Sequence, residues 1–358
     1  MPARVARYHL QNWHPDAIVR SGNHERRGHM STHFPVTYST LSAKALARYL
    51  SAHYVLNEIA ELNFLCRGLN DTYLVKCGAD EKYIFRIYRA NWRSRTDIAH
   101  EVAALTHLRD SGVAVSQALR RRDGAHQCTF EAPEGVRHAV LFAFAPGKEI
   151  SYENGGDVPA YRYGRGVAAI HNAMEAFSTS YQRAALDLNH LVGAPLRHIE
   201  PFMARRRADW EYLQRLADKI LDAFNRVPLD SLQYGFCHGD FNGGNAHVTD
   251  GGELTFFDFD CCGPGWRAYD IAVFRWSARV VEKEEERWEP FLNGYRNVRE
   301  LKQVDLDVTP LFVGARAIWL LGLHAANACD WGSDWMNEAY FDRAMKFLRR
   351  WDDETLAP

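Results

Sequence analysis

One short segment constrains the fold of this chain more than any other. It begins with His238-Gly239-Asp240, continues through four residues to Asn245, and ends at Asp258 and Asp260 after two short apolar runs. An Asp-Gly-Gly turn separates the two runs, which is the pattern of a tight β-hairpin. Because the strands of a hairpin are antiparallel neighbours, Asn245 and Asp258 are predicted to lie side by side at one end of the ribbon.

The residue types at that end indicate phosphoryl transfer. The amide oxygen of Asn245 and the carboxylate of Asp258 are hard ligands suited to Mg²⁺. Asp240, one short loop away, is placed to orient a hydroxyl group and accept its proton. We therefore predict an ATP- and magnesium-dependent kinase with Asp240 as catalytic base. The alternative is structural, with Asp240 as a turn residue and Asn245 as a cap at the start of a strand.

Length and composition are consistent with this hypothesis and disfavour several other classes of protein. A chain of 358 residues predicts two domains or lobes, and 47% hydrophobic residues supply a substantial core. A formal net charge of -2 gives no reason to expect nucleic acid or an anionic membrane as partner. The seven cysteines include no C-x-x-C pair, which favours a reducing cytoplasm over a zinc site or a disulfide framework. Cys261 and Cys262 are interpreted as space-filling residues.

The first part of the chain predicts a small antiparallel sheet. Residues 1–34 are interpreted as a poorly ordered extension, and residues 35–145 as the N-terminal lobe. One helix is predicted from Thr96 to Arg109, laid against the sheet, after a stretch of helical spacing from Ser39 to about Ala60. The expected strands are Tyr73–Val75, Tyr83–Tyr88, two short strands around the Asp123-Gly124 turn, and Ala139–Phe144.

Residues 146–358 are predicted to form a larger, mainly helical lobe. The fold class is therefore α+β with two lobes. No apolar run is read as long enough to span a bilayer, and the stretch Ala317–Leu323, flanked by Arg316 and His324, is interpreted as a buried helix. His171, on another apolar helix, is interpreted as a packed histidine.

These motifs resemble the aminoglycoside phosphotransferase and choline kinase superfamily over roughly Ser39 to Trp351. The Asp-x-x-x-x-Asn spacing is that of the catalytic loop of protein kinases, and Asp-Phe-Asp stands where those enzymes have Asp-Phe-Gly. The segment from Arg86 to Leu108 is particularly similar to bacterial stress-response kinases, and homoserine kinases are similar as well. The resemblance implies a bilobal protein-kinase-like fold that binds ATP and Mg²⁺ between its lobes.

The resemblance also implies roles for individual residues. The metal ligands would be Asn245, Asp258 and Asp260, with Asp240 as base. Arg86 stands where the family has a phosphate-holding lysine, and Glu101 would be its partner. The remaining implied roles are loop support by His238 and Asp270, adenine recognition by the hinge strand through Phe142 and Phe144, and a phosphate-covering turn at Gly68–Thr72 that includes Asn70 and Thr72.

The acceptor is predicted to be a hydroxyl group of a small molecule, such as an aminoglycoside or other antibiotic, an amino alcohol or a homoserine-like metabolite. The short interval between Asp258 and Asp270 leaves no room for a long activation loop. A bacterial Ser/Thr protein kinase and a non-catalytic nucleotide-binding module remain alternatives. Candidate contacts for a cationic acceptor are Asp330, Asp334 and Glu338 beside Trp331, although the same residues also fit a solvated helix entry.

Overall fold

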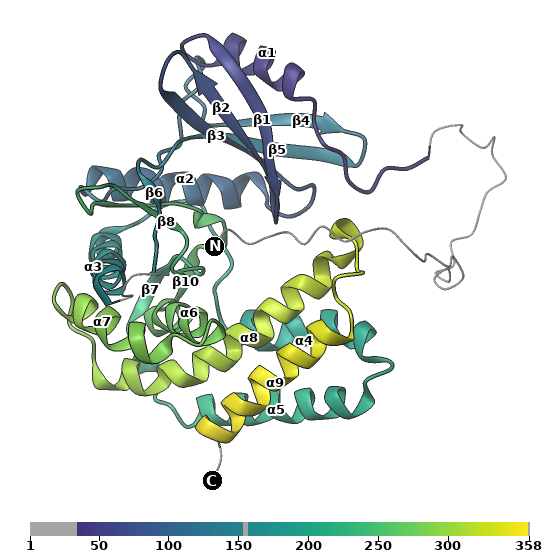
Figure 1. Ribbon diagram of the computed structural model, residues 1–358, viewed down its shortest axis with the longest axis vertical. Coiled ribbons are helices and arrows are strands. Elements are labelled where there is room, and N and C mark those ends of the chain that lie inside the picture. The colour runs from purple at the N-terminus through teal and green to yellow at the C-terminus, as the bar shows by residue number, and fades with distance from the viewer. Residues whose placement is uncertain (1–33, 153–156, 357–358) are drawn as a thin grey trace. The chain divides into compact units, whose positions relative to one another are not determined.

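A five-stranded antiparallel sheet forms the first part of the computed structural model, in the order β1-β2-β3-β5-β4 (Figure 1). The structure describes residues 34–152 and 157–356. The sheet and the helices all lie in the compact unit that begins at Val36. The extension predicted for residues 1–34 falls outside the described residues except for Phe34. The strands are β1 Ile59–Arg67, β2 Asn70–Cys77, β3 Glu81–Tyr88, β4 Gln127–Ala132 and β5 Gly135–Ala143.

Two helices cover the two faces of this sheet. Helix α1, Ala43–His53, packs its buried Leu46 and Leu50 against side chains such as Phe85. Helix α2, Arg95–Asp110, begins with a capping box formed by Ser94 and covers the other face. The sequence predicts one helix on the sheet, and the structure has two. The second is α1, which occupies part of the stretch of helical spacing from Ser39 to about Ala60.

Two strand predictions were wrong. Strand β1 was missed because it is an exposed edge strand in which only Leu62 is buried, so its sequence has no regular apolar alternation. The turn at Asp123-Gly124 exists, but it does not join two strands. The residues before it make only an isolated bridge between Ala118 and Phe142, and β4 pairs with β5 across the next turn instead.

The rest of the chain is mainly helical, which confirms the predicted α+β class. Two small ribbons lie among the helices. In the first, β7 Tyr234–Cys237 pairs with β10 Gly263–Trp266; in the second, β6 Lys148–Glu149 joins the hairpin of β8 Ala246–Val248 and β9 Leu254–Phe256. The longer helices are α3 Asp157–Ala173, α5 Arg207–Asn225, α6 Arg267–Val280, α7 Glu284–Arg296, α8 Gln303–Trp331 and α9 Glu338–Thr355, with the short α4 at Ala194–Ile199.

Helix α8 is the central helix of this part. It contacts α4, α5, α6 and α9, and 15 of its side chains are buried. Within residues 34–152 and 157–356 it is the one helix long and apolar enough to cross a membrane by length and composition, and 61% of its most apolar window is buried. The apolar run is thus longer than expected from sequence. It is apolar around most of its surface because other helices enclose it.

Candidate active site

The hairpin places Asn245 beside the segment that carries Asp258. Strands β8, Ala246–Val248, and β9, Leu254–Phe256, pair with Ala246 opposite Phe256. The ladder extends one residue further, because the backbone N–H of Phe257 donates to the carbonyl oxygen of Asn245 at 3.0 Å. Asp258 follows in the left-handed region, with φ 64°, which is uncommon for a residue with a Cβ.

Asp240 is hydrogen-bonded to Asn245 through its backbone and its side chain. The amide Nδ2 of Asn245 donates to the carbonyl oxygen of Asp240 at 2.9 Å and to its Oδ2 at 3.0 Å. Because Nδ2 is used in this way, Oδ1 is the side-chain oxygen of Asn245 left for its predicted role as a metal ligand. The structure therefore brings together the three residues that the sequence grouped as base and metal ligands.

The turn before Asp240 requires glycine. Gly239 has φ +79°, and a Cβ built on it would overlap the carbonyl oxygen of Cys261. Gly124 has a similar φ of +85° but has open space around it, so it isolates the cost of the backbone conformation.

We expect Gly239→Ala to lower the free energy of unfolding by more than the roughly 1–3 kcal/mol typical of a strained backbone conformation. Gly124→Ala, with the strain and no overlap, should lose only that amount. Urea unfolding of the two variants measures the difference. Equal losses would mean that the approach of Gly239 to Cys261 contributes nothing to the turn.

A buried carboxylate fixes the backbone of this loop. Asp270, on α6, accepts hydrogen bonds from the backbone N–H groups of His238 and Gly239, both at 2.8 Å. His171 lies 3.0 Å from the same carboxylate through Nε2 and 2.9 Å from the hydroxyl of Tyr295 through Nδ1. Burial lowers the pKa of His171, so we assign the neutral tautomer with the proton on Nε2. The sequence predicted His171 to be a packed histidine. It is buried, and its hydrogen bond also orients Asp270.

His238 links the same loop to the hairpin. Its side chain is fully buried, stacked on Phe241, and its Nε2 lies 3.1 Å from the carbonyl oxygen of Phe257. The loop that carries Asp240 is therefore fixed by two contacts: its backbone is bound by Asp270, and His238 binds it to the end of the hairpin.

Arg86 connects the sheet to the hairpin. Its Nη1 donates to Glu101 at 2.7 Å, and its Nη2 donates to Asp258 at 2.9 Å. Tyr88 donates its hydroxyl to the other oxygen of Glu101 at 2.6 Å. Burial alone would lower the pKa of Arg86. The carboxylates of Glu101 and Asp258 outweigh burial and keep this pKa above its ordinary value. The fork of an arginine, unlike a lysine, spans both acids at once.

Asp260 has different surroundings from Asp258. It is buried and accepts hydrogen bonds from Asn70 at 3.0 Å, Trp92 at 2.8 Å and Arg93 at 2.9 Å. Burial raises the pKa of this carboxyl, but Arg93 and the other donors outweigh it and hold the pKa below its usual range. Both oxygens of Asp260 are engaged by protein donors, and these hydrogen bonds join the sheet lobe to the helical part. The roles of Asp260 as a metal ligand and of Asn70 at the phosphates stay predictions.

These residues surround a pocket of about 750 Å³ between the sheet and the helical part. Burial raises the pKa of Cys262 to about 12 and raises that of Cys261, in its wall, as well, which fits space-filling thiols. Predicted site residues that line the pocket are Asn70, Thr72, Arg86, Glu101, Phe142, Phe144, Asp240, Asp258 and Asp260.

The candidate acceptor contacts do not line this pocket. Asp330 forms an ion pair with Arg89 at 3.2 Å, and Glu338 forms one with Arg206. Asp334 is exposed, and Trp331 is half-buried in an aromatic cluster with His324 and Trp335. Two of the three acids are already neutralised by arginines, which weakens the hypothesis that they bind a cationic acceptor.

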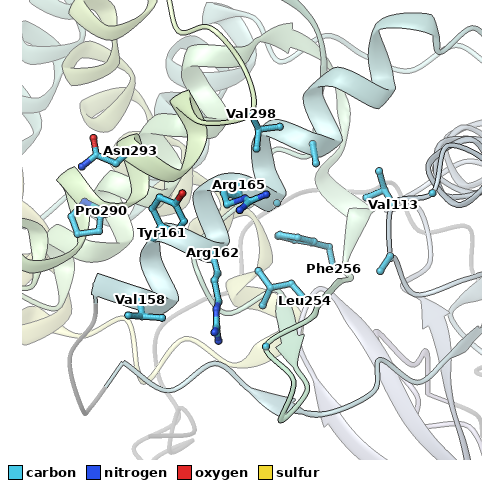
Figure 2. A pocket seen from close by; sticks show the side chains of 15 residues that line it. Val113, Val158, Tyr161, Arg162, Arg165, Leu254, Phe256, Pro290, Asn293 and Val298 are labelled. Atoms are coloured by element: carbon cyan, nitrogen blue, oxygen red, sulfur yellow. The ribbon is translucent and has the colours of Figure 1, made fainter.

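A larger hollow, of about 890 Å³, lies elsewhere (Figure 2). Figure 2 shows side chains of α3, β9 and α7 around it, among them Arg165, Phe256 and Asn293. None of the residues that the sequence assigned to catalysis or metal binding lines this hollow. We take the smaller pocket as the candidate active site because Asp240, Asp258 and Arg86 line it.

The fold and the site define a phosphotransferase with a protein-kinase-like fold. The chain belongs to the phosphotransferase enzyme family, which it matches over residues 67–304. It is 38% identical to an uncharacterized protein of Deinococcus radiodurans over 89% of this chain and 93% of that protein. Among solved structures it is similar to a microcompartment-associated aminopropanol kinase, at 26% identity and TM-score 0.66, covering 86% of this chain and 94% of the other.

A second solved structure shares the fold. It is an amicoumacin kinase in complex with AMP-PNP, Ca²⁺ and Ami, at 19% identity and TM-score 0.69, and the match covers 88% of this chain and 93% of that one. The predicted family and fold are confirmed by these comparisons, while the roles of single residues stay predictions.

Proposed function

We propose that this protein transfers the γ-phosphate of ATP to a hydroxyl group of a small molecule in a magnesium-dependent reaction. The observation that carries the proposal is that Asp240 and Asp258 line one pocket, with Asn245 hydrogen-bonded to Asp240 and Arg86 reaching Asp258 from the sheet. The attacking hydroxyl oxygen forms a bond to the γ-phosphorus, the bond to the β-phosphate oxygen breaks, and ADP leaves. Asp240 orients the hydroxyl and accepts its proton.

The pocket has a place for adenine at the end of β5. Phe142 and Phe144 supply apolar walls, but the backbone N–H of Phe144 already donates to the carbonyl oxygen of Lys82 at 3.3 Å. The carbonyl oxygen of Ala145 accepts a hydrogen bond from His247. We therefore assign adenine recognition to the backbone N–H of Ala145, which donates to no acceptor among the described residues.

Asn245 and Asp258 would hold the metal ion. Among the described residues there is no cluster of three His, Cys, Asp or Glu side chains that could hold a metal by itself. This fits Mg²⁺, which binds one or two protein oxygens and completes its shell with phosphate oxygens and water. Bound there, the ion would neutralise the charge of the phosphates. A solved structure of the same fold, the amicoumacin kinase, is in complex with AMP-PNP and Ca²⁺.

Arg86 would serve the phosphates and also hold Glu101. We expect Arg86→Met to lower the free energy of unfolding by about 3–5 kcal/mol, because it leaves the buried Glu101 without a cation. Arg86→Lys keeps a positive charge near Glu101 and should retain most of that stability. Urea unfolding compares the two. If the methionine variant were as stable as the lysine variant, the buried pair would not be the link between sheet and helix α2 that we describe.

The acceptor is proposed to be a small molecule rather than a protein. The interval between Asp258 and Asp270 is filled by β10 and the start of α6, which pack against β7, so no long activation loop is present there. The similar proteins act on small molecules by their names, aminopropanol and amicoumacin.

The test is a screen for acceptor-dependent ATP consumption by the full-length chain. Amino alcohols, aminoglycosides, other antibiotics, homoserine and a protein substrate are each added with Mg²⁺, and the Asp240→Asn variant is run in parallel. We expect at least one small hydroxyl compound to stimulate ADP formation by the wild-type chain and not by the variant. Stimulation by the protein substrate alone would favour the protein-kinase alternative, and identical behaviour of the two chains would contradict the proposal.

A further inference from the structure

Arg316 is a buried cation that the sequence did not connect to the site. It lies in the middle of α8 and is only 3% exposed. A guanidinium group is almost never buried without a partner, because it loses its hydration. Two of its partners belong to the catalytic loop: Nη2 donates to Oδ1 of Asp240, and Nη1 donates to the carbonyl oxygen of Gly239 at 3.2 Å. Nη1 also lies 3.5 Å from the hydroxyl of Tyr269 on α6.

Two indole rings hold this guanidinium in place. Its Cζ lies 4.5 Å from the ring centre of Trp319 and 5.1 Å from that of Trp276, on α6. Trp319 is itself fixed, since its Nε1 donates to Nε2 of His190 at 3.0 Å. Burial lowers the pKa of His190 to about 4, which keeps that nitrogen an acceptor at neutral pH. Arg316 thus occupies a slot whose walls are anchored independently of Asp240.

The carboxylate of Asp240 is consequently held at both oxygens. Oδ1 is bound by Arg316 from α8, and Oδ2 is bound by Asn245 from the start of the hairpin. Two donors on different elements fix the rotation of the carboxylate plane. The direction in which Asp240 faces the pocket is therefore set by α8 as well as by its own loop.

We propose that Arg316 is a positioning residue, which aims the Asp240 carboxylate at the acceptor hydroxyl. The proposal rests on the proposed kinase function. Because phosphoryl transfer depends largely on positioning, a carboxylate that turns away loses turnover while the nucleotide still binds. Arg316 does not itself line the pocket, and its hydrogen bonds go to Gly239, Asp240 and Tyr269 rather than to the predicted metal ligands Asn245 and Asp258.

The first measurement separates turnover from nucleotide binding. The full-length chain is assayed for slow ATP hydrolysis with Mg²⁺, in which water is the acceptor. Arg316→Met keeps apolar contact with the two indoles, and we expect its kcat to fall about 10²-fold, as for a misplaced catalytic group, with KM for ATP unchanged. Arg316→Lys should fall between methionine and wild type. Arg267→Met, which removes another buried arginine, paired with Glu175, should keep kcat.

The second measurement is chemical rescue. Arg316→Ala leaves an empty slot between Trp276 and Trp319, so added guanidinium ion, well below denaturing concentration, should raise its kcat. The same addition should not raise the kcat of Arg316→Met, where the slot is filled, or of Asp240→Asn, where the partner carboxylate is missing. This pattern requires a guanidinium beside Asp240 and would not arise from a general loss of packing.

The outcomes distinguish the two proposals. If wild-type hydrolysis does not exceed that of Asp240→Asn, the kinase function fails and the role of Arg316 fails with it. If the wild type is active but Arg316→Met keeps its kcat, changes only KM, or Arg316→Ala gains nothing from guanidinium, the positioning role alone is wrong. Melting temperatures of all variants are measured first, and the lysine variant replaces any that does not fold.

Discussion

Replacing Asp240 by asparagine is expected to lower phosphoryl transfer roughly 10²–10⁴-fold, the usual contribution of a positioned general base. The substitution keeps the size of the side chain but removes its charge, so the acceptor hydroxyl loses its proton acceptor. Arg316 is also left without its anionic partner. The measurement is kcat with the acceptor found in the screen, together with Kd for ATP and Mg²⁺, which should change little.

Asp218, an exposed carboxylate on α5, provides the matched control. Asp218→Asn carries the same chemical change far from the pocket and should keep wild-type turnover. If Asp240→Asn also kept wild-type turnover, Asp240 would not be the base, and the structural alternative for that turn would stand.

The second large effect is expected for Asp258→Ala, which should abolish the magnesium dependence of nucleotide binding. Without this carboxylate, Asn245 is the only predicted ligand left on the hairpin, and one amide oxygen does not hold Mg²⁺. Arg86 would lose one of its two acids but keep Glu101, so the fold should survive. Titration of the chain with an ATP analogue, with and without Mg²⁺, measures the effect.

Asp250, at the tip of the same hairpin, is almost fully exposed and serves as the control. Asp250→Ala should bind nucleotide with the wild-type dependence on Mg²⁺. A variant at Asp258 that still responded to Mg²⁺ like the wild type would place the metal on other residues.

The hairpin site could be predicted because its residues are close in sequence and its spacing is set by local geometry. A tight turn fixes the register of the two strands, so the sequence places Asn245 and Asp258 at the same end of the ribbon. Asp240 is only a short loop away. The pairing of Arg86 with Glu101 could also be predicted, from the family resemblance. The two residues are close in sequence, on a strand and on the next helix of the sheet lobe.

The contacts made across long stretches of chain could not be predicted. Arg316 reaches Asp240 from α8, and nothing in the apolar pattern of α8 distinguishes this arginine from a flanking surface charge. Asp260 looked like a ligand because it follows Asp258 closely, yet Arg93 and Trp92, far earlier in the chain, bind both of its oxygens.

The predicted acceptor contacts are weakened for the same reason. Asp330 and Glu338 were chosen as a cluster of acids near Trp331, but each is paired with an arginine that is distant in sequence. Charge clustering along one helix entry therefore does not identify a cation site when the neighbours from other elements are unknown.

The most direct test of the account is a crystal structure of the full-length chain with Mg²⁺ and a non-hydrolysable ATP analogue. We expect the analogue in the pocket of about 750 Å³, with Asn245 Oδ1 and the Asp258 carboxylate on a metal ion that also binds phosphate, and Asp240 facing the γ-phosphate. Nucleotide bound in that pocket with the metal on Asp260 instead, or nucleotide in the hollow of Figure 2, would contradict the assignment.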